Sequence, residues 1–485
     1  MSKIGSDKNT VLKSLAWKLL ERMGTSGISF IMQLVLARLL LPSDYGVIAL
    51  VTVFIAVASI FVESGIGTSL IQKKEIDELD ISSIFFLSFS VALILYLCLF
   101  IAAPFIATFY ENQSLIKITR VLALTLIIGS FNTIQTALLS RNMQFRTIFL
   151  CNVSSSISSG IGGITLAYLG YGVWALVAQQ LLATLGVTII LFIVVAWRPV
   201  ARFSFKKVKN LYSFGWKLMA SSVISTIYVN LRNLVIGKKF SPAMLGYYNK
   251  GSSFPSFFNA NVTGSIRSVL FPALSVHQDS LERIKAMTRR SVAMSSFLVF
   301  PMMAGLIAVA KPLIIITLTE KWLPAVPILQ LVSISYAFMP ISAANLQALN
   351  AIGRSDIYLR LQFIKRSLGL IILAFSLHFG IYGIVIGEVL AEILSFLINI
   401  YPNRKILKYG YREQAKDILP PLFLSVVMGS GVFLLSSTNL SPFPLMTLQI
   451  ITGVIFYIGI AWLLKMESFL YIMDSIKPVA NYFRR

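Results

Sequence analysis

Ionisable side chains inside long apolar runs are the residues of this sequence with the clearest capacity for chemistry. A charge at the centre of a membrane helix costs a few kcal/mol, so it persists mainly where it meets a partner or a water-filled cavity. The basic residues in such runs are Lys18, Arg22, Arg38, Lys117, Arg120, Lys217, Arg232, Lys250, Arg267, Lys365 and Arg366. The acidic ones are Glu21, Glu63, Glu388 and Glu392. Internal pairing cannot neutralise this surplus of cations, and the sequence therefore predicts an anionic ligand.

A subset of these cations forms the candidate substrate-binding site: Lys18, Arg22, Lys217, Arg232, Lys250 and Arg267. Arginine can bind phosphate oxygens through two parallel hydrogen bonds, and the Asn and Tyr residues near Arg232 and Lys250 can bind sugar hydroxyl groups. The alternatives are an ion pair of Lys18 with Glu21 and a polar seam between helices. The other cations lie near predicted helix ends, where they can extend to lipid headgroups.

Glu388 and Glu392 are four residues apart and therefore share one face of a predicted helix. Two carboxylates on one face repel each other when both are ionised, which favours a proton on one of them. The pair is a candidate for proton or sodium coupling. Pairing with a neighbouring basic helix is the alternative.

Signatures of catalysis and of cofactor binding are not found in the sequence. The two histidines, His277 and His378, are too few for a histidine-rich metal site or a catalytic triad. No glycine-rich phosphate loop followed by Lys and Ser or Thr is present. Cys98 and Cys151 both lie in apolar runs, which favours buried packing. We therefore expect no enzyme activity, no catalytic residue, no metal and no cofactor.

Composition indicates that these charges lie in a lipid bilayer. Of 485 residues, 56% are hydrophobic and 13% are charged, against about 25% charged in soluble domains. Fourteen apolar runs of spanning length, from 13–41 to 443–464, are separated by loops too short to hold a catalytic domain. The net charge of +23 comes mainly from basic residues in alternate loops, which predicts two cytoplasmic termini and no nucleic-acid partner.

An internal repeat organises the apolar runs. Residues 12–20 (LKSLAWKLL) recur as 211–219 (LYSFGWKLM), and 41–46 (LPSDYG) correspond to 241–246 (SPAMLG). The offset predicts an all-α membrane protein with two six-helix bundles, residues 1–205 and 206–403. Two extra transmembrane helices and a basic cytoplasmic tail follow in 404–485. Because six is even, the two bundles have the same orientation, an arrangement that places a cavity between them.

Short motifs along the chain resemble those of one family. They are QLVLARLLLPSDYG at 33–46, ESGIG at 63–67, LIQKKE at 70–75, LGYYN at 245–249, VLFPAL at 269–274, EKW at 320–322 and PILQL at 327–331. From about residue 10 to 460 the sequence resembles the polysaccharide-transport family. It is close to the Wzx-type exporters of colanic acid and teichuronic acid in the MOP (MATE-like) superfamily.

The resemblance implies a flippase that moves undecaprenyl-diphosphate-linked oligosaccharide from the inner to the outer leaflet by alternating access. Capsule, exopolysaccharide or O-antigen of lipopolysaccharide would be the product. It also implies a bacterial inner-membrane protein whose partners are membrane lipid and other polysaccharide-assembly proteins. The acidic position after the second helix is kept as Glu63, a third candidate for ion coupling, and the arginine of the first helix as Arg38. Arg232 departs from the family, in which relatives often carry an acidic residue at that position.

Two other functions remain open from the sequence. A MATE-like ion-coupled antiporter of the same fold would need an acidic cavity, which the surplus of cations opposes. A membrane glycosyltransferase or polymerase would need catalytic carboxylates or a sizeable outer loop. Anion handling follows from the residues alone, whereas the lipid-linked sugar follows from the resemblance.

Overall fold

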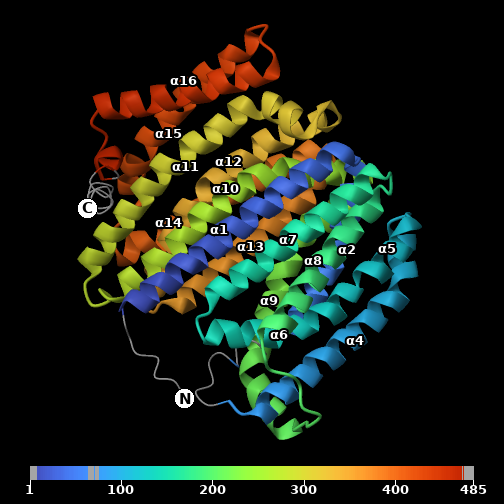
Figure 1. Cartoon of the computed structure of the whole chain (residues 1–485). Coiled ribbons are helices and arrows are strands. Elements are labelled where there is room, and N and C mark those ends of the chain that lie inside the picture. The colour runs from blue at the N-terminus through green and yellow to red at the C-terminus, as the bar shows by residue number, and fades with distance from the viewer. Residues whose placement is uncertain (1–7, 64–69, 71–75, 472, 474–485) are drawn as a thin grey trace. The chain divides into compact units, whose positions relative to one another are not determined.

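The chain is mainly helical in the part that the computed structural model describes, which comprises residues 8–63, 70, 76–471 and 473 (Figure 1). No strand occurs in those ranges. Side chains are described for these residues except 8–16, 18–22, 206, 209–215, 217, 218, 267 and 269. Two compact units divide the chain, Met1–Gly246 and Tyr247–Arg485. The predicted all-α membrane fold is confirmed.

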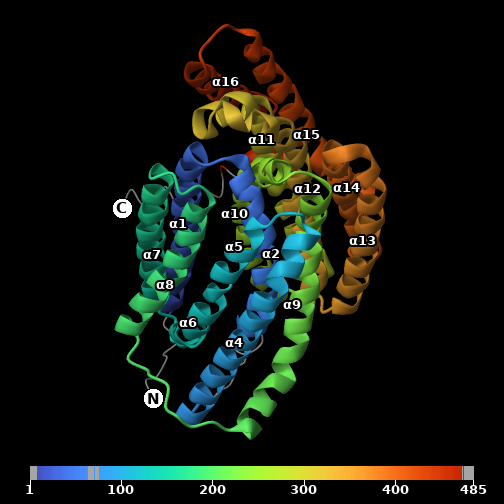
Figure 2. The ribbon, with the colours of Figure 1, turned by 90° about the vertical axis from the view of Figure 1, so that its right-hand side faces the viewer.

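The first unit contains eight labelled helices and the beginning of a ninth. They are α1 (Lys8–Leu39), α2 (Pro42–Glu63), α4 (Glu78–Phe109), α5 (Ser114–Leu122), α6 (Leu124–Arg141), α7 (Phe145–Tyr168), α8 (Val173–Val194), α9 (Phe205–Lys239) and the start of α10 (Pro242–Ser275). α7 packs on α1 and α8, and α9 packs on α2 and α4 (Figure 2). The predicted boundary at residue 205 coincides with the start of α9. The division into 1–205, 206–403 and 404–485, which follows from the sequence repeat, stays a prediction.

The second unit contains the rest of α10 and the helices that follow it. They are α11 (Leu281–Leu318), α12 (Val326–Ala351), α13 (Ser355–Ser376), α14 (Gly380–Ile406), α15 (Tyr411–Leu434) and α16 (Pro442–Leu463). α12 packs on α11 and α14, while α15 and α16 pack on α11 (Figure 1). An apolar cluster that includes Phe297, Leu424, Met428 and Tyr457 holds the last two helices against α11.

Each predicted apolar run contains a helix, and the run at 115–139 contains two because the chain turns at Ala123 between α5 and α6. Ten helical segments of the described chain are long and apolar enough to cross a membrane. α1, α9 and α10 are not among the ten, so the count of fourteen spans stays a prediction. These three helices carry all of the candidate substrate-binding cations.

Small residues allow close approach of the helices in the first unit. A Cβ atom on Gly160 of α7 would lie 2.7 Å from Sδ of Met32 in α1, and one on Gly186 of α8 would lie 2.6 Å from Oγ of Ser155. Ser155 also donates a hydrogen bond of 2.6 Å to the carbonyl of Ala183. Close packing and interhelical hydrogen bonds of this kind stabilise helix pairs in a membrane, where apolar lipid supplies little driving force.

The two copies of the repeated motif contact each other within the first unit. A Cβ atom on Gly46 would lie 1.8 Å from the carbonyl oxygen of Pro242, and one on Gly246 would lie 1.9 Å from the carbonyl oxygen of Pro42. The first turns of α2 and α10 therefore meet backbone to backbone through equivalent residues. Only glycine fits such a contact without displacing a helix.

The segment between α8 and α9 is attached to the beginning of α4. Ser82 and Ser83 accept hydrogen bonds from the backbone N–H groups of Val200 (3.1 Å) and Ser204 (2.9 Å). Lys207 of α9 pairs with Asp77, the N-cap residue of α4, and with Asp80 at 3.5 Å. The Lys207 ammonium and the Asp80 backbone N–H lower the pKa of Asp77 to about 2.

This pairing predicts a pH-dependent contribution of Asp77 to stability. Because the folded pKa lies below the usual value of about 3.9, the stabilisation is present above pH 4 and lost as the pH falls through about 2. Asp77→Asn should therefore lower the unfolding temperature at pH 6, by an amount that shrinks between pH 4 and pH 2. Thermal unfolding in detergent measures this, with Asp279→Asn in an exposed turn as control. A difference independent of pH would contradict the assignment.

Candidate functional site

The structure describes the side chains of only part of the predicted cation group. Lys18, Arg22, Lys217 and Arg267 lie on α1, α9 and α10, but their side chains are outside the described residues. Arg232 of α9 is half-buried, whereas Lys250 of α10 is 4% exposed. Arg38 and Arg120, two of the cations predicted near helix ends, have surroundings that differ from each other. Arg38 is exposed, and the Arg120 guanidinium lies 4.0 Å from the Phe100 ring centroid.

Lys250 lies where α10 packs closely on the beginning of α12. A Cβ atom on the next residue, Gly251, would be 3.0 Å from the carbonyl oxygen of Ala325 and 3.1 Å from the backbone nitrogen of Leu329. Burial of an ammonium is costly unless polar groups or an anion compensate it. Lys250 is therefore a buried cation beside a tight helix crossing in the second unit.

Glu388 and Glu392 have different partners in the structure. The hydroxyl of Tyr248 in α10 donates a hydrogen bond of 2.9 Å to Oε2 of Glu388, a buried residue of α14. Glu392, one turn later, interacts electrostatically with Lys365 of α13. The environments of the two carboxylates therefore differ. The interaction of Glu392 with Lys365 is of the kind that the alternative to ion coupling describes, in which a carboxylate pairs with a neighbouring basic helix. Their role in ion coupling stays a prediction.

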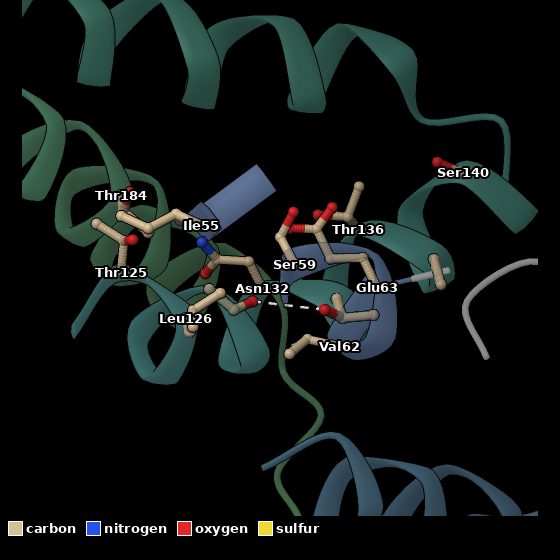
Figure 3. Close-up of a pocket in the computed structure, with 13 residues that line it drawn as sticks. Ile55, Ser59, Val62, Glu63, Thr125, Leu126, Asn132, Thr136, Ser140 and Thr184 are labelled. Carbon is tan, nitrogen blue, oxygen red and sulfur yellow. Dashed lines mark hydrogen bonds between the residues drawn. The ribbon is translucent and has the colours of Figure 1, made fainter. Parts of the chain in front are cut away.

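Glu63 lies in a cavity of about 510 Å³ inside the first unit (Figure 3). The cavity is lined by Ile55, Ser59, Val62, Glu63, Thr125, Leu126, Gly129, Asn132, Thr133, Thr136, Ala137, Ser140 and Thr184. The α2 and α6 residues among them recur at spacings of three or four, so each helix turns one face to the cavity. Thr184 comes from α8. We call this space the Glu63 pocket.

Sequence reasoning found Glu63 but missed its surroundings. The signal that was available is the polar series Thr125, Asn132, Thr133, Thr136 and Ser140, which falls on one face of an otherwise apolar helix. Such a series is inconspicuous because hydroxyl residues in membrane helices commonly bond their own backbone. Among the described residues, no group of three or more His, Cys, Asp and Glu side chains could hold a metal ion.

Comparison with known proteins places this fold in a family. Residues 35–327 match the family model described as polysaccharide biosynthesis protein. The chain belongs to this family. The resemblance inferred from the sequence motifs is thereby confirmed.

Curated relatives of the family are similar to the chain over most of its length. Succinoglycan biosynthesis transport protein ExoT of Rhizobium meliloti is 26% identical over 72% of this chain and 70% of its own. Lipopolysaccharide biosynthesis protein WzxC of Escherichia coli is 23% identical over 86% of both chains. Teichuronic acid biosynthesis protein TuaB of Bacillus subtilis is 24% identical over 78% of both.

Solved structures share the fold of this family member. The lipid II flippase MurJ in an inward closed conformation matches with a TM-score of 0.75 and 17% identity, over 92% of this chain and 98% of its own. An inward-facing multidrug resistance MATE transporter of the MOP superfamily matches with a TM-score of 0.60 and 16% identity, over 80% and 96%. The chain therefore has the fold of these two proteins, and the ten long apolar helical segments of its described part are those of a multi-pass membrane protein.

Proposed function

We propose that the chain is a flippase that moves undecaprenyl-diphosphate-linked oligosaccharide from the inner to the outer leaflet of a bacterial inner membrane. The observation that carries the proposal is membership of the polysaccharide biosynthesis protein family over residues 35–327. Among its relatives, ExoT is named as a transport protein of succinoglycan biosynthesis. Alternating access between two leaflets is the mode of action that a two-bundle transporter allows. The product would enter synthesis of a surface polysaccharide.

The surplus of cations supports recognition of the diphosphate group. Basic residues on α1, α9 and α10 would attract the phosphate oxygens by charge-assisted hydrogen bonds. Arg232 offers a planar guanidinium for two such bonds, and the buried ammonium of Lys250 offers a point charge. A MATE-like antiporter of cations is less favoured, because a cationic ligand would be repelled by the same residues.

The disposition of the chain in the membrane is part of the proposal. Both termini would be cytoplasmic, and the free energy for transport would come from ion coupling at Glu63, Glu388 or Glu392 or from consumption of the product. The flippase would perform no chemical step itself. Other polysaccharide-assembly proteins would act on its substrate before and after translocation.

Transport by the reconstituted protein tests the proposal. Wild-type proteoliposomes should flip a fluorescent undecaprenyl-diphosphate oligosaccharide. The variants Arg232→Ala and Lys250→Met should bind the same lipid roughly 10- to 100-fold more weakly than the wild-type protein does. This range corresponds to about 1.5–3 kcal/mol for a hydrogen bond to a charged group. Lys217→Ala and Arg267→Ala are expected to show the same direction of change. Arg412→Ala, at an exposed position of α15, is the matched control.

Two results would contradict the flippase proposal. One is failure of wild-type protein to flip the lipid-linked sugar while it exchanges cationic drugs for protons or sodium, the behaviour of an antiporter. The other is formation of new glycosidic bonds by the purified protein, the behaviour of a transferase or polymerase.

A further inference from the structure

The Glu63 pocket is a polar cavity built within one unit of a chain whose exterior is mostly apolar. α2 supplies Ser59 and Glu63, α6 supplies most of the other polar groups, and α8 supplies Thr184. Figure 3 shows Ser59, Glu63, Asn132 and Thr136 around the same space. Polar groups on membrane-spanning helices are energetically unfavourable unless they meet a partner or a water-filled cavity. Their convergence on one cavity indicates a ligand.

The lining of the Glu63 pocket is rich in hydrogen-bond acceptors. The hydroxyl groups of four lining residues already donate to backbone carbonyls three or four residues earlier in the chain: Ser59 to Ala56 (3.1 Å), Thr125 to Leu122 (2.6 Å), Thr133 to Gly129 (3.4 Å) and Thr184 to Gln180 (3.0 Å). Each of these oxygens keeps lone pairs with which it can accept a further bond.

Two further acceptors reinforce this character. The Oδ1 atom of Asn132 is buried and has no hydrogen-bond partner among the described residues. Glu63 contributes a carboxyl group. Of the described side chains that line the pocket, none is Lys, Arg or His. A carboxyl group and hydroxyl oxygens accept hydrogen bonds, so a ligand that donates hydrogen bonds would be stabilised here.

Chemistry and size decide which part of the substrate fits. A diphosphate carries only acceptors and negative charge, so this lining would repel it. A sugar ring presents several hydroxyl donors, and an acetamido sugar adds an N–H donor. A bare ion needs only a coordination shell a few ångströms across, whereas about 510 Å³ lies within the range of about 300–1,000 Å³ found for small-molecule sites.

We propose that the Glu63 pocket binds a neutral, hydroxyl-rich sugar of the translocated glycan. The inference rests on the proposed function and deepens it, because it separates recognition of the sugar from recognition of the diphosphate. The carboxyl group of Glu63 accepts from sugar hydroxyl groups. The threonine and serine oxygens complete the set of acceptors.

Gly129 provides a variant that fills the pocket without disturbing its neighbours. A Cβ atom on Gly129 would meet no atom within 4 Å, although the residue lines the pocket. Gly129→Leu should therefore place a side chain in the cavity while α6 stays intact, since leucine favours a helix more than glycine does. Gly459→Leu in α16 is the matched control, because its Cβ atom also meets nothing within 4 Å and it lies outside the pocket.

The experiment compares two probes: undecaprenyl-diphosphate-linked oligosaccharide extracted from the host, and undecaprenyl diphosphate without sugar. Wild-type protein in detergent should bind the glycosylated lipid at least tenfold more tightly. Gly129→Leu and Asn132→Leu should abolish this preference while the Kd for the sugar-free lipid changes less than twofold. Gly459→Leu should keep the preference, and unchanged binding of the sugar-free lipid shows that the variants are folded.

Three results would overturn the inference, and they are distinguishable. If both pocket variants keep the preference for the glycosylated lipid, the sugar binds elsewhere. If Glu63→Gln loses proton- or sodium-driven transport but keeps the preference, the pocket is an ion site. If wild-type protein binds neither lipid, the proposed flippase function fails, and the sugar pocket fails with it.

Discussion

Alanine at Gly46 should destabilise the protein by at least about 3 kcal/mol, and alanine at Gly246 should have a similar effect. The added Cβ atom would lie 1.8 or 1.9 Å from a proline carbonyl oxygen, where about 3.3 Å is the usual closest approach. Both contacting groups are backbone, so no side-chain rotation can relieve the clash and one helix must move. We expect a large loss of monodisperse protein in size-exclusion chromatography and a lower unfolding temperature.

A double-mutant cycle and a control variant sharpen this prediction. Both glycines lie in one helix crossing, so the first substitution already separates the two helices. The double variant Gly46→Ala with Gly246→Ala should therefore lose clearly less free energy of unfolding than the sum of the losses in the two single variants. Gly27→Ala in α1 should be neutral or slightly stabilising, because its Cβ atom meets nothing within 4 Å. If Gly46→Ala and Gly246→Ala unfold at the same temperature as the wild-type protein, the close contact is refuted.

Helix positions were predictable because a bilayer leaves the chain few choices. Every backbone N–H and C=O group in the hydrocarbon region must bond internally, so a long apolar run there forms a helix. The run at 382–401, for example, lies inside α14 (Gly380–Ile406). The turn at Ala123 was not predictable in the same way, because no proline or glycine marks it and its backbone stays close to helical, with φ −61° and ψ −19°.

The partners of individual residues were harder to predict than the helices. The sequence singled out Glu388, but its hydrogen-bond donor, Tyr248, is 140 residues away and is chosen by the packing of α10 and α14. Glu63 was found both as a charge in an apolar run and through the family resemblance, but the acceptors around it come from three helices. Periodicity shows which face of a helix is polar, whereas side-chain shape decides which faces meet.

The partners within a buried amide network of the second unit could not be predicted from the sequence either. Asn345 of α12 donates to Oε1 of Gln414 (3.0 Å), and its own Oδ1 accepts from Gln414 (2.9 Å) and from Asn403 (2.8 Å). All three side chains are fully buried. Because Gln414 belongs to α15 and Asn403 to α14, the network joins α15 to α12 and α14.

Asn345→Leu should lower the free energy of unfolding by about 3 kcal/mol. The substitution removes three hydrogen bonds between helices, worth about 1 kcal/mol each, and a longer bond of 3.4 Å to the Ile341 carbonyl of the same helix. It also leaves the buried amide groups of Gln414 and Asn403 with fewer partners. Thermal unfolding in detergent should show a decrease of several degrees. Limited proteolysis between α14 and α15 should become faster, because the same amides hold α15 in place.

Asn399 of α14 supplies a control in which we expect leucine not to lower the free energy of unfolding. It is 1% exposed, and its Oδ1 atom has no hydrogen-bond partner among the described residues. Asn399→Leu replaces an unsatisfied buried acceptor by an apolar group of similar size, so it should be neutral or stabilising. The two substitutions are chemically identical and differ only in the partners of the amide. Equal losses of stability in both would show that the amide network contributes nothing beyond the packing of a buried asparagine.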